Sequence, residues 1–286
     1  MATGPPETPD IGALDFETAL SVDAVEEAAR ALAGEGPARA ALEALCRGEP
    51  AIDIAGLRAG YGRMEILHGV DLVAGRGQSL CLIGPNGAGK STVLHAAFGF
   101  ADVMAGRISV GAREVTRLAP SRRLAEAGVA YVLQDNSVFP DMTVEENLLM
   151  GGHLLARRGA ARQATERVFD RYGSLARRRH RRAGVLSGGE RRLLEISRAL
   201  IMEPDVLLVD EPSIGLEPRF IDMVFEILGD LQREDGKTIV MVEQNAKKGL
   251  EFADIGYVLV SGRLAMAGPG SALLEDPEVG RLFLGA

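Results

Sequence analysis

A glycine-rich loop in the first third of the chain has the residue types and spacing that hold phosphate. Residues 84–91 read Gly-Pro-Asn-Gly-Ala-Gly-Lys-Ser, between an apolar run at 79–83 and a helix-forming stretch at 92–98. Glycines let successive backbone N–H groups point toward phosphate oxygens, and the positive N-terminal end of the next helix favours the same anion. We expect Lys90 to reach the outer phosphates and the Ser91 hydroxyl to hold Mg²⁺. The predicted nucleotide-binding residues here are Gly84, Pro85, Asn86, Gly87, Ala88, Gly89, Lys90, Ser91 and Thr92.

A second pattern places two carboxylates at the end of an apolar strand. Residues 206–209 read Val-Leu-Leu-Val, and Asp210 and Glu211 follow directly. Alone, this pattern also fits an ordinary turn. Together with the phosphate loop it favours the other half of an ATP site, in which Asp210 supports Mg²⁺ through water. Glu211 would then polarise a water molecule for in-line attack on the γ-phosphate.

A third pattern opens a helix that is expected to run to about residue 202. Residues 186–190 read Leu-Ser-Gly-Gly-Glu, so Ser187 is a good N-cap and Glu190 completes a capping box. The simplest interpretation is a well-capped helix. However, Gly188 and Gly189 each weaken that helix by roughly 1 kcal/mol relative to alanine. Bare backbone at a helix start suits a phosphate, which favours a second phosphate-contacting surface.

The elements that position these residues alternate between strands and helices, which predicts an α/β protein with a buried parallel sheet. The runs at 206–209 and 238–242 flank a helix expected at about 220–233, which is a βαβ crossover. Residues 143–200 are expected to be mostly helical, with breaks near 173 and 183–184. The expected strands are 52–59, 70–74, 79–83, 107–110 with 114–115, 129–133, 206–209, 238–242, 256–260 and 264–267.

Composition bounds the remaining possibilities. The chain has 286 residues and a net charge of −8, most of which lies in residues 1–50, where 10 acidic residues face 3 basic ones. The body of the chain is nearly neutral, so no nucleic-acid partner is expected. The run at 177–182, with five arginines and a histidine, is either a solvated surface or a contact for an acidic partner or lipid. Two distant cysteines, no long apolar run and no signal-like start predict no disulfide, membrane span or secretory leader.

Two domains are expected. Residues 1–50 form an acidic N-terminal extension, partly helical or disordered, with two short helices between 15 and 46 joined at 34–37. Residues 51–286 form the ATPase domain, with a helical subdomain at about 136–200. The extension is interpreted either as a tail or as a small module that docks on the domain or on a partner.

These motifs together resemble an ABC transporter ATPase. The resemblance rests on residues 84–91, Gln134, 186–190 and Asp210-Glu211, in that order, and covers about 51–286. It implies a P-loop NTPase fold with a mixed core sheet, an antiparallel β subdomain and a helical subdomain. It also implies that two copies pack head to tail, with each ATP between the phosphate loop of one copy and the Ser-Gly-Gly segment of the other. Glu190 stands where glutamine is usual.

Other single residues also match positions of the ABC transporter ATPase pattern. Tyr61 matches the aromatic residue that stacks on adenine, although it could instead be an edge-strand tyrosine. Gln134 matches the loop glutamine that touches Mg²⁺ and connects the core to the helical subdomain. Residues 213–217 match the loop that crosses the dimer interface, and Glu217 stands where aspartate is usual.

The segment after 238–242 departs from the family pattern. A histidine usually follows this strand and contacts the γ-phosphate, but residues 242–245 read Val-Glu-Gln-Asn. Gln244 occupies that place, and its amide can donate a hydrogen bond but carries no charge. Hydrolysis is still expected, because Glu211 and the electrostatic clamp around the phosphates remain.

One subgroup is especially similar. The segment 243–245, the stretch 142–148 and the ending 276–285 resemble ATPases of branched-chain amino acid uptake systems and their urea and amide relatives. In that subgroup two ATPases, identical or different, sit beneath two transmembrane permease subunits that a periplasmic or extracellular solute-binding protein supplies. The resemblance therefore implies a peripheral subunit at the cytoplasmic face of the inner membrane.

Three alternatives remain at this point. The ATPase of lipopolysaccharide export has a similar Ser-Gly-Gly-Glu-Arg-Arg stretch, but the segment 243–245 argues against it. A soluble ABC ATPase of DNA repair or translation would usually carry a coiled-coil insert or two cassettes. A nucleotide-binding regulator is conceivable because the usual histidine is missing.

Overall fold

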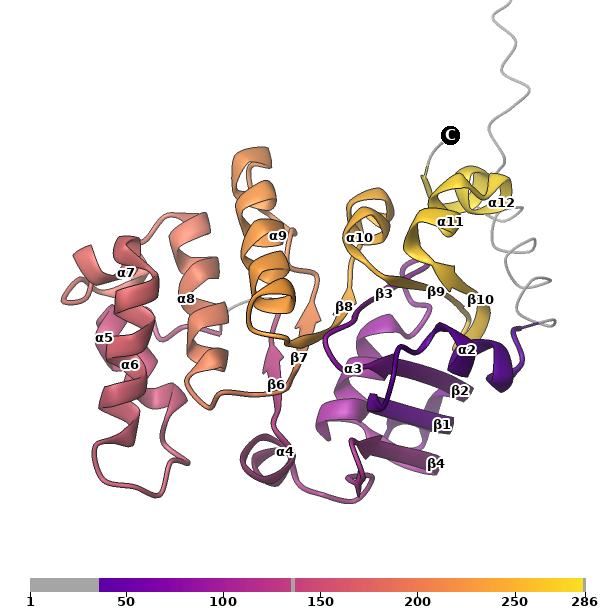
Figure 1. Ribbon diagram of the computed structural model, residues 1–286, viewed down its shortest axis with the longest axis horizontal. Coiled ribbons are helices and arrows are strands. Elements are labelled where there is room, and N and C mark those ends of the chain that lie inside the picture. Colours follow the sequence, from indigo (N-terminus) through magenta and orange to yellow (C-terminus); the bar gives the residue numbers. More distant parts are fainter. Residues whose placement is uncertain (1–35, 135–136, 285–286) are drawn as a thin grey trace, which may run out of the picture.

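The computed structural model describes residues 36–134 and 137–284, which form two β-sheets with helices around and between them (Figure 1). The strands are β1 (Pro50–Tyr61), β2 (Met64–Gly75), β3 (Ser79–Ile83), β4 (Asp102–Val110), β5 (Arg113–Glu114), β6 (Val129–Val132), β7 (Val206–Asp210), β8 (Thr238–Val242), β9 (Ile255–Val260) and β10 (Arg263–Pro269). The helices are α2 (Arg39–Leu45), α3 (Lys90–Phe98), α4 (Pro120–Ala127), α5 (Val144–Gly151), α6 (Ala160–Arg171), α7 (Gly173–Arg177), η1 (Ala183–Val185), α8 (Gly188–Leu200), α9 (Pro218–Arg233), α10 (Ala246–Phe252), α11 (Gly270–Glu275), α12 (Pro277–Val279) and η2 (Gly280–Leu284). None of these helices is long and apolar enough to cross a membrane.

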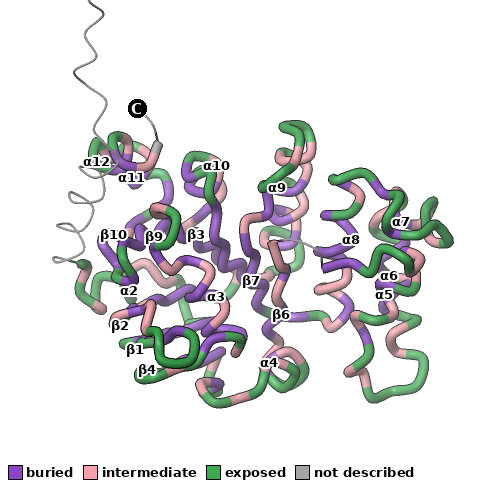
Figure 2. The backbone as a smooth tube through the Cα atoms, turned by 180° about the vertical axis from the view of Figure 1, so that it is seen from behind, coloured by how far each residue is buried: buried purple, intermediate pink, exposed green. Residues whose placement is uncertain are grey.

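The six-stranded sheet is the core of the fold. Its strand order is β10-β9-β3-β8-β7-β6, and all neighbours are parallel except β9 and β10. Every residue of β3, β7 and β8 is buried, which explains why these segments are continuous apolar runs (Figure 2). The carboxyl ends of these parallel strands meet at one edge of the sheet. The loops that follow β3, β7 and β8 are therefore brought together there.

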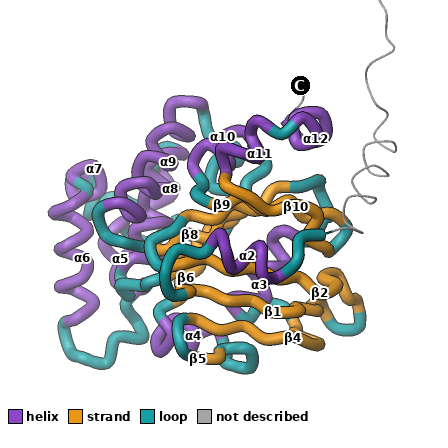
Figure 3. The backbone as a smooth tube through the Cα atoms, turned by 45° about the vertical axis from the view of Figure 1, so that its right-hand side comes forward, coloured by secondary structure: helices purple, strands orange, loops and turns teal. Residues whose placement is uncertain are grey.

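The phosphate-loop helix α3 lies between the two sheets. The second sheet has the order β2-β1-β4-β5 and is antiparallel (Figure 3). Helix α3 contacts strands of both sheets, and its apolar residues share one core with them. The opposite face of the six-stranded sheet carries α8, α9 and α10, which enclose a second core. The predicted α/β fold with a mixed core sheet and an antiparallel sheet is confirmed.

Helices α5–α8 form a helical layer at one side of the molecule, which α8 joins to the six-stranded sheet (Figure 1). This layer has its own apolar core, contributed by residues between 138 and 201. Helix α5 begins with a complete capping box between Thr143 and Glu146, and α8 with one between Ser187 and Glu190. The arginine-rich run lies in this layer, where Arg179 pairs with Glu145 at 2.6 Å. Such pairs favour the interpretation of that run as ordinary surface.

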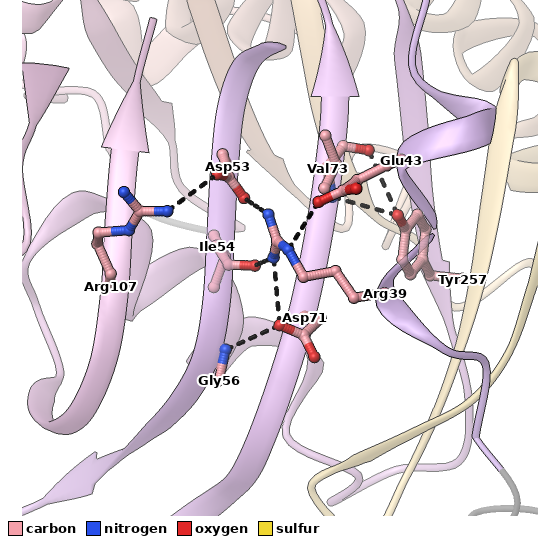
Figure 4. A network of polar contacts seen from close by, with 9 residues as sticks. All are labelled: Arg39, Glu43, Asp53, Ile54, Gly56, Asp71, Val73, Arg107 and Tyr257. Carbon is pink, nitrogen blue, oxygen red and sulfur yellow. Dashed lines mark hydrogen bonds and ion pairs between the residues drawn. The ribbon is translucent and has the colours of Figure 1, made fainter. Parts of the chain in front are cut away.

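Helix α2 packs against the β-sheets, although its residues belong to the predicted N-terminal extension. The Arg39 guanidinium donates to Asp53 at 2.6 Å, to Asp71 at 3.3 Å and to the Ile54 carbonyl at 3.1 Å (Figure 4). Leu42 is fully buried in the core shared with α3. The other helix expected in the extension lies outside the described residues.

Replacing Leu42 with alanine is expected to lower the free energy of unfolding by about 2–4 kcal/mol, because it leaves a cavity beneath α2. Denaturant unfolding of the full chain measures this. Glu43→Ala, on the exposed face of the same helix, should change stability by less than about 1 kcal/mol. A Leu42→Ala variant as stable as the parent would show that α2 contributes nothing to the folded domain.

Two helices were not anticipated from the sequence. Helix α4 starts with Pro120 at its first position, and its Arg123 is 2% exposed. That guanidinium donates to the carbonyls of Ala96 and Ala97 at the end of α3. Helix α10 is seven residues long and follows its N-cap Asn245, whose side chain accepts from the Lys248 N–H. Both helices are too short for their periodicity to be informative.

Candidate functional site

The phosphate loop joins β3 to α3 in a backbone conformation that requires glycine. Gly84 has φ 146°, and a Cβ there would lie 2.0 Å from the Leu259 carbonyl oxygen of β9. Gly89, with φ 96°, is the N-cap of α3 and contributes no side-chain cap. The first N–H groups of a helix have no intrahelical acceptor. This uncapped helix start is therefore suited to an anion, as the sequence predicted.

Lys90 is the cation of this loop. Its side chain is buried, and its ammonium donates to the carbonyls of Gly84 at 2.8 Å and Pro85 at 3.0 Å. Burial lowers the pKa of Lys90, while the nearby carboxylates of Glu211 and Asp210 act in the opposite direction. The ammonium is thus already positioned across the loop that is expected to surround the phosphates.

Ser91 and Asp210, two of the three predicted metal-binding residues, are in direct contact. The Ser91 hydroxyl donates to Asp210 Oδ1 at 3.0 Å, and Asp210 is 4% exposed. The other oxygen of Asp210 accepts a hydrogen bond from the Tyr131 hydroxyl at 2.7 Å. One carboxylate oxygen and one hydroxyl therefore lie side by side, and both are ligand types that Mg²⁺ prefers. The donor set fits the predicted magnesium ion.

Glu211 and Gln134 complete this edge of the sheet. The Gln134 amide donates to Glu211 Oε2 at 3.1 Å, so the third predicted metal ligand contacts the predicted base. Glu211 has φ 42°, a left-handed conformation that is unfavourable for a residue with a side chain. Its N–H donates to the Val242 carbonyl at 2.9 Å, which joins the end of β7 to the end of β8. The strained backbone is therefore that of Glu211, the residue predicted to polarise the attacking water.

Tyr61, the predicted adenine platform, is at the end of β1 and is 42% exposed. Its hydroxyl is hydrogen-bonded to His95 Nδ1 of α3. The His95 ring is 5.7 Å from the Tyr131 ring, and burial lowers the pKa of His95. An exposed aromatic face beside the phosphate loop is what stacking on a base requires.

The segment Ser187-Gly188-Gly189-Glu190 lies in the helical layer, apart from the phosphate loop. Ser187 and Gly188 are exposed, and the Ser187 hydroxyl and Glu190 carboxylate bond to each other. A Cβ at Gly189 would lie 2.3 Å from the Phe220 ring of α9, so close packing also requires this glycine. Within the described residues, this segment forms its hydrogen bonds locally and with Arg178, not with residues 84–91.

Comparison with known proteins identifies the family. The sequence profile of the ABC transporter family matches residues 67–214. The chain belongs to the ABC transporter family. The predicted resemblance and the predicted ATPase activity are confirmed.

Curated relatives of this ABC ATPase are transport ATP-binding proteins. BraG of Pseudomonas aeruginosa, a high-affinity branched-chain amino acid transport ATP-binding protein, is 42% identical over 79% of this chain and 95% of its own length. The probable branched-chain amino acid transport protein LivF of Archaeoglobus fulgidus is 37% identical over 80% of this chain and 96% of its own. LivG of Salmonella typhimurium is 31% identical over 83% of this chain and 98% of its own.

Solved structures agree with the fold. A nucleotide-free ATP-binding cassette from an ABC transporter superimposes with a TM-score of 0.73 and 26% identity, covering 83% of this chain and all of that one. The ADP form of another such cassette gives a TM-score of 0.73 with 27% identity, covering 84% of this chain and all of that one. The ABC nucleotide-binding fold is thereby confirmed.

In this ABC ATPase, Arg192 links the helical layer to the nucleotide edge of the sheet. It is 4% exposed on α8 and pairs with Glu195 at 2.9 Å. Its guanidinium also donates to the Leu133 carbonyl at 2.6 Å and to the Asp210 carbonyl at 3.2 Å. Movement of α8 is therefore tied to the ends of β6 and β7, the strands that precede Gln134 and Glu211.

Sequence reasoning missed three polar residues of this site: Tyr131, Arg192 and Glu243. Each is held by partners far away in the chain, as in the Tyr131–Asp210 bond across 79 positions. No local motif reveals such bonds. Gln244, the predicted substitute for histidine, is exposed directly after Glu243. Whether it meets a phosphate remains a prediction.

Proposed function

We propose that this chain is the ATP-hydrolysing subunit of an importer for branched-chain amino acids or related small polar solutes such as urea and amides. One observation supports the assignment of ATP hydrolysis to particular residues. The side chains that would perform it lie together at one edge of the sheet: Lys90, Ser91, Asp210, Glu211 and Gln134. The substrate class is supported by the names of BraG and LivF, which match most of this chain. We place the subunit at the cytoplasmic face of the inner membrane.

In this proposal the residues act as follows. The loop N–H groups and Lys90 bind the β- and γ-phosphates, Tyr61 stacks on adenine, and Ser91 and Asp210 hold Mg²⁺ with Gln134. The bound Mg²⁺ would neutralise charge on the phosphate oxygens. Glu211 orients and polarises the attacking water, and Gln244 donates a hydrogen bond to the γ-phosphate.

We further propose that catalysis requires a second ABC ATPase, identical or related. Ser187, Gly188, Gly189 and Glu190 form their hydrogen bonds away from the phosphate loop of their own chain. The N-terminus of α8, where Ser187 and Gly188 are exposed, would instead meet the γ-phosphate of nucleotide bound to a partner. ATP binding would close the dimer, and hydrolysis would reopen it.

A groove between the helical layer and the core is the proposed permease contact. It has a volume of about 260 Å³ and is lined partly by Phe139, Met150, Tyr131 and Arg198. Phe139 and Met150 are 46% and 43% exposed, and the Arg198 guanidinium lies 5.6 Å from the Phe139 ring centre. Exposed apolar side chains in a concave site suit a short helix of a membrane subunit. Tyr131, which lines the groove, donates to Asp210 at 2.7 Å, so movement there would reach the nucleotide edge.

The double variant Phe139→Ala, Met150→Ala is expected to reduce recovery of permease subunits by about tenfold or more, because two apolar anchors are lost. Recovery is measured by purifying the tagged chain from its own detergent-solubilised membranes and quantifying multi-span subunits. Met104→Ala removes a comparably exposed methionine from β4 and should have no effect. Full recovery by the groove variant would contradict this contact.

The transported solute is tested in the same cells. Replacing the chromosomal copy with Lys90→Ala should abolish high-affinity uptake of radiolabelled leucine, isoleucine and valine, or of urea. Uptake of an unrelated sugar serves as control. Unchanged uptake of all these solutes would contradict the proposed substrate class while leaving the ATPase assignment intact.

A further inference from the structure

A buried carboxylate joins two loops of the nucleotide edge. Glu243 directly follows β8, is 1% exposed, and forms no ion pair with any residue in the described ranges. Its Oε1 accepts hydrogen bonds from the Ser213 hydroxyl at 2.7 Å and from the Asn245 N–H at 2.9 Å. Its Oε2 accepts from the Ser213 N–H at 3.4 Å. Both oxygens are thus bonded, and their donors come from separate loops.

These two loops carry the residues proposed to act on the γ-phosphate. Ser213 is two residues after Glu211, and the Ile214 N–H donates back to the Glu211 carbonyl at 3.2 Å. Gln244 lies between Glu243 and Asn245, and Asn245 is fixed as the N-cap of α10. The backbone of Gln244 is therefore held on both sides while its side chain stays exposed. Ser213, Ile214, Glu243, Gln244 and Asn245 line a cavity of about 340 Å³.

The position of Glu243 is closely confined. A Cβ on Gly249 of α10 would lie 3.1 Å from the Glu243 Cβ and 2.6 Å from the Cys81 sulfur of β3. Burying a carboxylate without a cation is unfavourable unless hydrogen bonds replace its hydration. An apolar side chain would fill this space at less cost. A charged group held only by donors from two site loops indicates a role in fixing those loops relative to each other.

We propose that Glu243 is a positioning residue that couples the 213–217 loop to the Gln244 loop. Contact of a partner subunit with the first loop would thereby set the position of the second at the γ-phosphate. This inference rests on the proposed ATP-bridged dimer. Glu243 itself touches no reacting atom and acts through Ser213 and Asn245.

The test is a double-mutant cycle of Glu243→Gln and Ser213→Ala. Glutamine keeps the shape of Glu243, but its NH₂ group must face one of the N–H donors of Ser213 or Asn245. Each single variant is expected to lower kcat about tenfold with KM for ATP changed less than about twofold, the size expected when a charge-assisted hydrogen bond is weakened. The double variant should be no slower than Glu243→Gln alone. Multiplicative losses, or an unchanged kcat in either single variant, would overturn the inference.

Asp222→Asn is the matched control. It also converts a carboxylate to an amide, and Asp222 of α9 pairs with Lys248 of α10 at 2.8 Å, but the pair is on the surface. Its kcat should equal that of the parent. Thermal unfolding is measured for every variant. Should Glu243→Gln fail to fold, Ser213→Ala, which removes one hydroxyl, decides alone: a normal kcat overturns the inference.

Dimerisation separates this inference from the function on which it rests. In a Glu211→Gln background, adding Glu243→Gln should raise the ATP concentration that gives half-maximal dimer by about tenfold. Dimer formation by Glu211→Gln with no effect of the added change would overturn the role of Glu243. Failure of Glu211→Gln itself to dimerise would instead overturn the proposed dimer.

Discussion

Glu211→Gln is expected to lower ATP turnover by about 10²–10⁴-fold, the contribution of a positioned general base, while leaving ATP binding intact. Glutamine preserves the size of the side chain and its reach to Gln134, but it cannot take a proton from water. Because the nucleotide is not consumed, the ATP-loaded subunits should accumulate as a closed dimer. Phosphate release and light scattering of the eluted species measure the two effects.

Glu203→Gln is the matched control for this experiment. Glu203 is also a glutamate with a left-handed backbone, φ 52°, but its side chain is 68% exposed on the loop before β7. It should turn over ATP at the parental rate. Normal turnover by Glu211→Gln would refute the assignment of the base, and a dead variant that stays monomeric with ATP would refute the composite site.

Lys90→Ala should remove most of the affinity for ATP. Losing the partner of a buried charge typically costs about 2–5 kcal/mol, which corresponds to a loss of about 30-fold or more in affinity. The parent ammonium already lies across the loop through bonds to the Gly84 and Pro85 carbonyls, so little reorganisation should precede phosphate binding. Titration with a fluorescent ATP analogue measures the affinity directly.

Lys247→Ala is the corresponding control, because it removes one positive charge from the exposed side of α10. It should bind nucleotide as the parent does. Circular dichroism should be the same for the parent and for Lys90→Ala. An unchanged affinity in a folded Lys90→Ala protein would remove the phosphate loop from the proposed site.

Much of this fold could be predicted because its core strands appear in the sequence as continuous apolar runs. The runs at 79–83 and 238–242 coincide with β3 and β8, since strands buried on both faces must be continuously apolar. The phosphate loop could likewise be predicted, since φ 146° at Gly84 and its contact with Leu259 leave no alternative to glycine. Local rules determine these features.

The parts that could not be predicted depend on distant partners. Arg123 is buried because carbonyls of α3 and of residues 116–118 accept its hydrogen bonds, and nothing near it in the sequence indicates this. In the sequence, Glu243 resembles any polar residue that follows a strand. Only the structure shows that the Ser213 hydroxyl donates a hydrogen bond to it. Periodicity and propensity cannot predict buried polar side chains whose hydrogen-bond partners are far away in the sequence.

The strand order also constrains how the protein is made. β3 pairs with β8 on one side and with β9 on the other, so its neighbours are translated long after it. The helical layer draws its core from residues between 138 and 201 and can close while synthesis continues. The loop after β3 gains a complete sheet only once residues 255–260 have left the ribosome. A prematurely ended chain would present both edges of β3 for aggregation, and the nucleotide site is thus among the last parts of the nascent chain to form.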